Sequence, residues 1–162
     1  MIVVSDTSPI NYLILTSCVD LLPRLFGQVI TPPTVLEELS HPRAPGPVRD
    51  WASSPPEWLI VKRPKAALLD SPLGPGEAAA IALAEECGAY LLIDERDGRA
   101  EAHRRGLTVV GTLAVLDRAA SLDLVDLPEA IERLRATNFH VSETLLEELL
   151  RRDRERSVTR ER

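Results

Sequence analysis

Short runs of aliphatic residues recur along the chain, separated by stretches in which apolar residues have helical spacing. Runs of this kind, bounded by turn residues, are typical of strands buried on both faces of a sheet. Five of them predict strands, at residues 2–5, 28–31, 58–61, 90–93 and 107–110. Strands that alternate with helices indicate a parallel sheet covered on both sides. The pattern therefore predicts an α/β fold around a central parallel sheet of about five strands.

The helices are marked most clearly by their ends. Ser8 predicts the start of the first helix as its capping residue, and apolar spacing continues that helix to residue 22. The clearest helix lies at residues 74–88, which are rich in alanine and carry Glu77 in the first turn. Residues 40–58 are rich in proline and predict an ordered connection around one helical turn. Further helices are predicted at residues 34–39, 98–105 and 112–121, and from about residue 127 onward.

Charge is unevenly placed along the chain. The net charge of the 162 residues is −6, but residues 151–162 hold six arginines against three acids, which leaves −9 on the rest. We expect one domain over residues 1–150, including the late helices, followed by a frayed, arginine-rich tail at residues 151–162. An acidic body does not suit passive binding of duplex DNA, which relies on many phosphate contacts. It suits an enzyme whose acids hold cations that then meet phosphates.

Nothing in the sequence indicates export or insertion into a membrane. No apolar run approaches the ~18 residues that cross a bilayer, and the N-terminus lacks the basic and apolar regions of a secretory signal. Cys18 and Cys87 lie far apart and form no metal or redox motif, which indicates small buried hydrophobes in a reducing compartment. We therefore expect a cytoplasmic protein with no membrane partner.

Acidic residues stand where two of the predicted strands end. Asp6 follows the first strand and Asp94 follows the fourth. The carboxyl ends of parallel strands share one edge of the sheet, and ligands bind at that edge. On the helix at residues 34–39, Glu38 lies beside the buried stripe, whereas Glu37 points away from it. Glu77 lies in the first turn of its helix, but the pattern does not decide which edge of the sheet that end approaches.

A gathering of these acids would need a neutralising partner. Two carboxylates 4 Å apart repel each other by ~1 kcal/mol in water and by ~4 kcal/mol at an effective dielectric constant of 20. Such a cluster persists only if protons are shared or a cation is bound. Oxygen ligands without Cys or His at matching spacing indicate Mg²⁺ or Mn²⁺ rather than Zn²⁺. A site of this kind suits hydrolysis of a phosphodiester by metal-activated water.

Four segments in order resemble a known family. VVSDTS, ITPPTVLEEL, GEAAAIALA and LLIDERDGRAEAHRRGLTVVGT are similar to motifs of the PIN domain, and the chain is most similar to short prokaryotic proteins related to VapC-type toxins. The resemblance runs from Ile2 to about Ala119 and more loosely into the late helices. It implies a three-layer α/β/α sandwich and a nuclease that cleaves RNA with Mg²⁺ or Mn²⁺.

The family's metal-binding acids fall on four positions of this chain. By resemblance they are Asp6, Glu38 with Glu37 as the fallback, Glu77 and Asp94. The family usually has Asp where Glu77 stands, and the longer side chain leaves open whether it binds metal directly or through water.

Neighbouring residues take supporting roles in this resemblance. Asp97 matches a frequent further metal-binding acid, although it could equally cap its helix, and Ser8 matches the small hydroxyl residue that supports the first acid. Thr112 either helps at the site through its hydroxyl or caps its own helix. Arg96 and Arg99 either bind the phosphate backbone of the substrate or pair with Glu95 and Glu101 on the surface.

The leading hypothesis is therefore a divalent-metal-dependent ribonuclease acting on single-stranded or structured RNA. The resemblance further implies the toxin of a type II toxin-antitoxin pair, an antitoxin protein that covers the acidic pocket, and a homodimer formed through the late helices. Two alternatives stay open. One is a non-catalytic PIN-like module that binds RNA or protein. The other is an aspartyl-phosphate phosphatase with Asp6 as nucleophile, although Ser8 stands where such enzymes have a second Asp.

Overall fold

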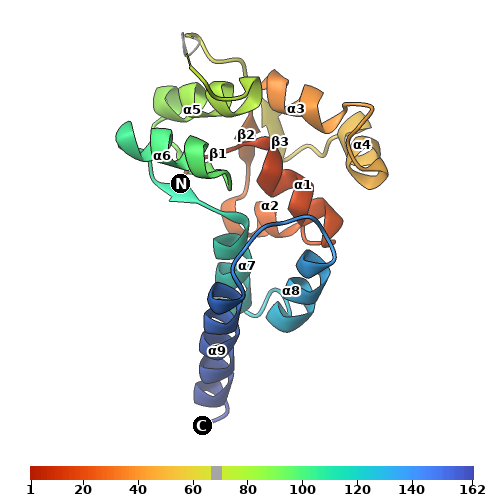
Figure 1. Cartoon of the computed structure of the whole chain (residues 1–162), viewed down its shortest axis with the longest axis vertical. Helices are drawn as coiled ribbons and strands as arrows, with labels where there is room; N and C mark the ends of the chain where they lie inside the picture. The colour runs from red at the N-terminus through yellow and green to blue at the C-terminus, as the bar shows by residue number, and fades with distance from the viewer. Residues whose placement is uncertain (67–70) are drawn as a thin grey trace.

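The strands form one sheet whose neighbouring pairs all run parallel. The computed structural model of the protein describes residues 1–66 and 71–162. Within these ranges the sheet has five strands in the order β3-β2-β1-β4-β5, which confirms the predicted parallel sheet (Figure 1). Their bounds are β1 (Val3–Ser5), β2 (Val29–Thr31), β3 (Leu59–Val61), β4 (Tyr90–Leu92) and β5 (Val109–Val110).

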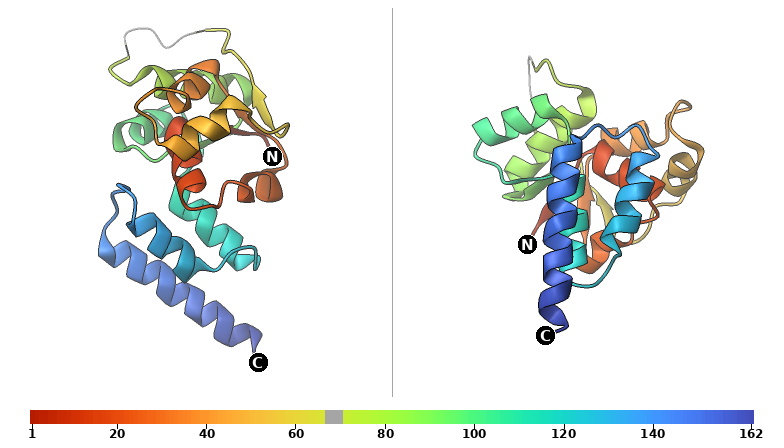
Figure 2. Two further views of the ribbon diagram at one scale, coloured as in Figure 1. Left: turned by 90° about the vertical axis from the view of Figure 1, so that its right-hand side faces the viewer. Right: turned by 60° about the horizontal axis from the view of Figure 1, so that its bottom comes forward.

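Helices connect the strands and complete the C-terminal part of the chain. In the described residues they are α1 (Thr7–Leu15), α2 (Leu21–Phe26), α3 (Pro33–Leu39), α4 (Gly46–Ser53), α5 (Pro75–Cys87), α6 (Arg96–Arg104), α7 (Thr112–Ser121), α8 (Leu127–Arg135) and α9 (Glu143–Arg160). Helices α7, α8 and α9 pack side by side at one end of the molecule (Figure 2).

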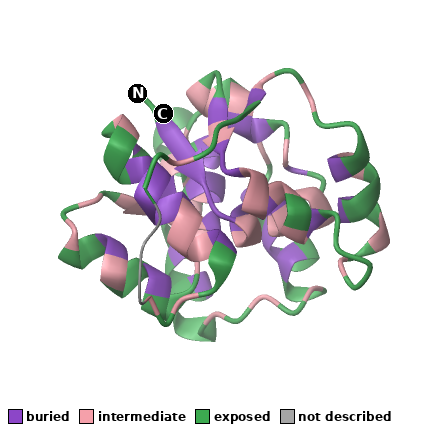
Figure 3. Ribbon diagram, turned by 90° about the horizontal axis from the view of Figure 1, so that it is seen from above, coloured by how far each residue is buried: buried purple, intermediate pink, exposed green. Residues whose placement is uncertain are grey.

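The sheet separates two hydrophobic cores, because successive side chains of a strand point to opposite faces. Val3 belongs to a core with buried residues of α1, α2, α7 and α8, whereas Val4 belongs to a second core with α5 and α6. In β4, Leu92 lies in the first core and Leu91 in the second. Buried residues run through the middle of the molecule and exposed residues follow the outer helices (Figure 3). This arrangement confirms the three-layer α/β/α sandwich.

The prediction of one long first helix is wrong. α1 ends at Leu15, and α2 begins only at Leu21. Between them the hydroxyl of Thr16 donates to the carbonyl of Tyr12 over 2.8 Å, and Ser17 has φ +58°, which turns the chain out of the helix. Ser8 is also not the cap, because α1 begins at Thr7 with Asp6 at the N-cap position.

Three other helices differ in extent from their predictions. α4 is longer than the single turn expected in the proline-rich connection, since it spans eight residues. α6 begins at Arg96, two residues before the predicted start. α9 extends to Arg160 and so includes most of the segment expected to be a frayed tail. Arg156 pairs with Asp117 of α7 over 2.9 Å, and Arg160 pairs with Asp123, so this part of α9 is tied to α7 and the residues after it, alongside which it lies (Figure 1).

Among the described residues, no helix combines the length and the apolar character needed to cross a bilayer.

Candidate active site

The carboxyl ends of β1 and β4 lie side by side at the centre of the sheet. Ser5 is in register with Leu92, and the backbone N–H of Asp6 donates to the carbonyl of Leu92 over 2.9 Å. β2 lies on one side of β1 and β4 on the other, so the strand order switches direction at this point. Ligands of open parallel sheets bind in the crevice at such a switch point. Asp6 and Asp94 therefore meet at the edge where the parallel arrangement predicts a site.

Asp6 is the most deeply buried acid of this edge, with 2% of its surface exposed. Although it stands at the N-cap position of α1, its carboxylate does not cap the helix, and within the described residues Oδ1 has no hydrogen-bond partner. Burial raises its pKa to about 7, with contributions in the same direction from the carboxylates of Glu38, Glu95 and Asp94, while the backbone N–H of Thr7 opposes them. A buried carboxylate oxygen left unpartnered favours either a proton or a cation at this place.

Asp94 is oriented by the start of α7. The backbone N–H of Thr112 donates to its Oδ1 and the Thr112 hydroxyl donates to its Oδ2, both over 2.7 Å. Burial raises the pKa of Asp94, and the two Thr112 bonds and the nearby Arg99 guanidinium oppose that rise. Gly111 keeps the approach close, because a Cβ there would lie 3.2 Å from Asp94 Oδ1. Thr112 therefore holds both carboxylate oxygens of Asp94.

The carboxylate of Glu38 accepts a hydrogen bond from the first turn of α5. The hydroxyl of Thr7 donates to its Oε2, and the backbone N–H of Gly76 donates to its Oε1 over 3.0 Å. Helix N-termini favour such anions because their first N–H groups lack partners within the helix. A Cβ at Gly76 would lie 2.6 Å from Oε1, so any larger residue would displace the Glu38 carboxylate from this position. Glu37, in contrast, is exposed.

Glu77 lies at the same edge, which the sequence left open. Burial raises its pKa to about 7, followed by the charge of Glu95 and a hydrogen bond with it, and by the charges of Asp6 and Glu38. The Glu77 carboxylate packs against Gly98 in the first turn of α6. The N-termini of α5 and α6 therefore converge on Glu77.

Glu95 is a further member of the cluster, which the sequence indicated only as a surface partner for arginines. Its charge acts on Asp6, Glu77 and Asp94. Within the described chain it forms no salt bridge. The available signal was its place directly after Asp94, where a strand has ended and the next helix has not yet begun.

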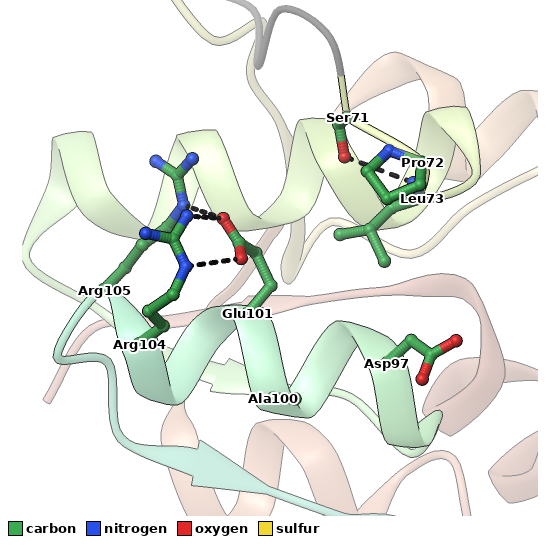
Figure 4. A pocket seen from close by; sticks show the side chains of 8 residues that line it. All are labelled: Ser71, Pro72, Leu73, Asp97, Ala100, Glu101, Arg104 and Arg105. Atoms are coloured by element: carbon green, nitrogen blue, oxygen red, sulfur yellow. Dashed lines mark hydrogen bonds and ion pairs between the residues drawn. The ribbon is translucent and has the colours of Figure 1, made fainter.

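Asp97 is not among the charges that act on Asp6, Glu77 or Asp94. It is exposed on α6 and lines a shallow cavity of 420 Å³ together with Ser71 and Glu101 (Figure 4). Glu101 forms salt bridges with Arg104 and Arg105, at 2.5 and 2.7 Å. In the described part of the chain it therefore does not pair with Arg96 or Arg99, which the sequence offered as partners.

The remaining candidates lie around the cluster. Arg99 approaches it, since a Cβ at Gly111 would lie 3.4 Å from its guanidinium and 3.2 Å from Asp94. Arg96 is exposed at the first residue of α6, and Ser8 is half-buried within α1.

The side chains do not form a ready-made metal site at these positions. Across residues 1–66 and 71–162, no three His, Cys, Asp or Glu residues are arranged to hold one metal ion. The reason is visible in the bonds: Glu38 is held by Thr7 and Gly76, and Asp94 by Thr112. The donors nevertheless fit a hard divalent cation in kind, because they are carboxylate oxygens and Asp6 Oδ1 is unpartnered.

Comparisons with known proteins agree with this fold. The family model described as DUF3368, a PIN domain, matches residues 2–155. Among solved structures, the chain is similar to a PilT N-terminus domain protein, SSO1118, from the hyperthermophilic archaeon Sulfolobus solfataricus P2, with 15% identity and a TM-score of 0.52. That match covers 88% of this chain and 100% of the other, and at this identity it shows the fold alone. The search of curated proteins gives no match.

Proposed function

This chain belongs to the PIN domain family, and from that premise we propose that it is a divalent-metal-dependent ribonuclease. PIN domains are typically nucleases. The observation that carries the proposal is Asp6, a buried carboxylate whose Oδ1 has no partner in the described chain and which stands beside Asp94 at the switch point of the sheet. Buried polar atoms are nearly always hydrogen-bonded. An exception at a ligand-binding edge supports a role in holding a cation.

The surroundings of each acid suggest how it would bind the metal. We assign Asp6 and Asp94 to direct ligation of Mg²⁺ or Mn²⁺, and Glu38, Glu77 and Glu95 to ligation directly or through water. When bound, the metal supplies an activated water and neutralises charge on the scissile phosphate. Before that, Asp6 and Glu77 must give up the protons that their raised pKa values favour.

Other side chains hold these groups in place or receive the substrate. Thr7 and Thr112 orient Glu38 and Asp94 through their hydroxyl groups. Arg99, beside Asp94, is placed to meet a phosphate of the RNA. From the resemblance we also assign a supporting role to Ser8 and phosphate binding to Arg96. Asp97 is assigned as a further metal-binding acid.

The test is cleavage of a labelled single-stranded RNA by the whole chain. Wild type is expected to cleave with Mn²⁺ or Mg²⁺ and to lose activity in EDTA or with Asp94→Asn. A matched pair sharpens the result: Glu38→Gln lowers the rate by at least about tenfold, whereas Glu37→Gln, an exposed acid on the same helix, leaves it unchanged. RNA that stays intact under all these conditions contradicts the proposal.

One observation favours a second candidate, a non-catalytic PIN-like module that binds RNA or protein. It is the lack of a three-ligand metal set among the described residues. The same assay separates the two, because the module would bind RNA tightly, with or without metal, and leave it uncut.

The wider proposal is that the chain is the toxin of a type II pair, acting in the cytoplasm as a homodimer. Its support is the resemblance to short VapC-like chains. An antitoxin would then cover the acidic cluster with a basic side chain. Expression of the wild-type chain is expected to arrest growth, and expression of Asp94→Asn is not. If the wild-type chain cleaves RNA but its expression leaves growth unchanged, the toxin role is contradicted and the ribonuclease proposal is not.

A further inference from the structure

A cavity of 580 Å³ opens beside the acidic cluster, on the side of the C-terminal helices. Asp94 is part of its lining, so the cavity is continuous with the candidate active site. Its other wall comes from the segment between α8 and α9, residues 139–142, and from the first turns of α9. The last helix of the chain therefore borders the site, although it lies far from Asp6 and Asp94 in sequence.

The free charge of this cavity is positive. Arg99 lies on one wall and Arg152 on the other, and neither forms a salt bridge within the described residues. Of the two acids in the lining, Asp117 pairs with Arg156 and Asp94 keeps its charge, so the lining holds two guanidinium groups against one carboxylate without an ion pair. Two guanidinium groups without partners suit the phosphates of an extended polynucleotide.

The rest of the cavity is largely apolar. Phe139, Val141 and Leu145 contribute to its lining, and Leu145 keeps 44% of its surface exposed. Phe139 is held in place by Tyr12, because the two rings pack edge to face with their centroids 4.9 Å apart. The Tyr12 hydroxyl in turn donates to Oδ1 of Asn138 over 3.0 Å. Unstacked bases of single-stranded RNA bind on such aromatic and apolar surfaces.

We propose that this cavity binds the nucleotide next to the scissile phosphate of a single-stranded RNA. Arg99 and Arg152 take phosphates of the strand, and the base lies against Phe139 and Leu145. The inference rests on the proposed function, because its occupant is the substrate of the same site. It adds that α9 is part of the substrate-binding surface.

The test measures the affinity of the whole chain for a short fluorescein-labelled single-stranded RNA in EDTA, so that nothing is cut. Arg152→Glu is expected to weaken binding by about tenfold and to lower the salt dependence by about one counterion. Its matched control is Arg154→Glu, the same change of charge on an exposed residue of α9 outside the cavity, which changes affinity less than twofold.

A second pair tests the apolar surface. Leu145→Glu is expected to weaken binding by at least fivefold, whereas Val158→Glu, at an aliphatic residue 52% exposed on the same helix, changes it less than twofold. Residue 145 is the third helical residue after the cap Ser142, where glutamate completes a capping box, so the change does not disrupt α9.

The outcomes separate this inference from the proposed function. If Arg152→Glu and Arg154→Glu weaken RNA binding equally, or if neither weakens it, the cavity is not the binding site. Weaker RNA binding by Leu145→Glu but not by Arg152→Glu also overturns it, because Arg152 would then hold no phosphate of the strand. Hydrolysis of bis(p-nitrophenyl) phosphate by wild type with Mn²⁺ tests the chemistry separately, because this diester carries no nucleotide chain. No hydrolysis together with selective loss of RNA binding refutes the nuclease and supports the cavity.

Discussion

Asp6 keeps its proton in the folded chain over a range of pH in which the unfolded chain has already lost it. Its pKa is about 7 in the fold, against 3.8 for an ordinary Asp, and Glu77 is raised to about 7 as well. Between these values the folded state binds more protons, so the free energy of unfolding falls as pH rises. One such group contributes a slope of at most about 1.4 kcal/mol per pH unit. Glu77 is half-buried, so solvent screening makes its contribution to stability smaller than that of Asp6.

The first prediction concerns the protein without metal. Its free energy of unfolding, measured with urea, decreases from pH 4.5 to pH 7.5, and Mn²⁺ restores it at the upper end because it binds the deprotonated acids. Asp6→Asn removes the contribution of Asp6 and flattens the dependence on pH. A stability that rises over this range, or an Asp6→Asn variant with the wild-type slope, contradicts the prediction.

The second prediction concerns the hydroxyl of Thr112. Thr112→Val keeps the shape of the side chain and the backbone N–H but removes the bond to Asp94 Oδ2. The expected loss is about 1–2 kcal/mol of stability, together with a fall in RNA cleavage, because the carboxylate is no longer held on both oxygens. Thr112→Ser restores the hydroxyl and is expected to recover both properties. If Val and Ser behave alike, the hydroxyl does not orient Asp94.

At the scale of elements, the close approach of α5 to Glu38 gives the third prediction. In Gly76→Ala the added Cβ meets the Glu38 carboxylate at 2.6 Å, so the side chain or the helix must shift. We expect a loss of about 1–3 kcal/mol in the free energy of unfolding and a weaker response of the melting temperature to Mn²⁺. The control is Gly46→Ala in the first turn of α4, where the nearest atom lies 3.9 Å away. Equal effects of the two changes contradict a specific role for Gly76.

The elements show what the sequence could and could not predict. Strands were predicted because each is a short aliphatic run between turn residues, and Glu38 was preferred over Glu37 because helical angle is a local property. The break between α1 and α2 was missed because apolar spacing continues through Cys18, while the break depends on a hydroxyl bond of Thr16 and a left-handed Ser17. Glu95 was missed because the acids near it include Asp6, at the cap of α1, and Glu77 of α5, which only the tertiary fold brings to it.

For the whole molecule, α9 joins the C-terminal arginines to an otherwise acidic chain. Its apolar contacts lie in the first half, where Leu146 and Leu149 are buried against the body, whereas its last turns are held by ion pairs of Arg156 with Asp117 and of Arg160 with Asp123. Between these two arginines Val158 is 52% exposed, and the C-terminus lies at the far end of the helix (Figure 1). The expected frayed tail is therefore helical as far as Arg160, and its last turn lies beyond the buried contacts that anchor the rest of the helix.

The fourth prediction is a gradient of hydrogen exchange along α9. Helical segments without tertiary burial open locally at little free energy, whereas those anchored in the core open only with larger units. Amides of residues 146–150 are expected to exchange slowly, those of residues 157–160 fastest, and those of β4 slowest of all. Slow exchange at residues 157–160 would mean that this end is held as firmly as the buried part of the helix. If the protection disappears on dilution, a second copy of the chain covers this end; if it persists, contacts within one chain hold the end of α9 in place.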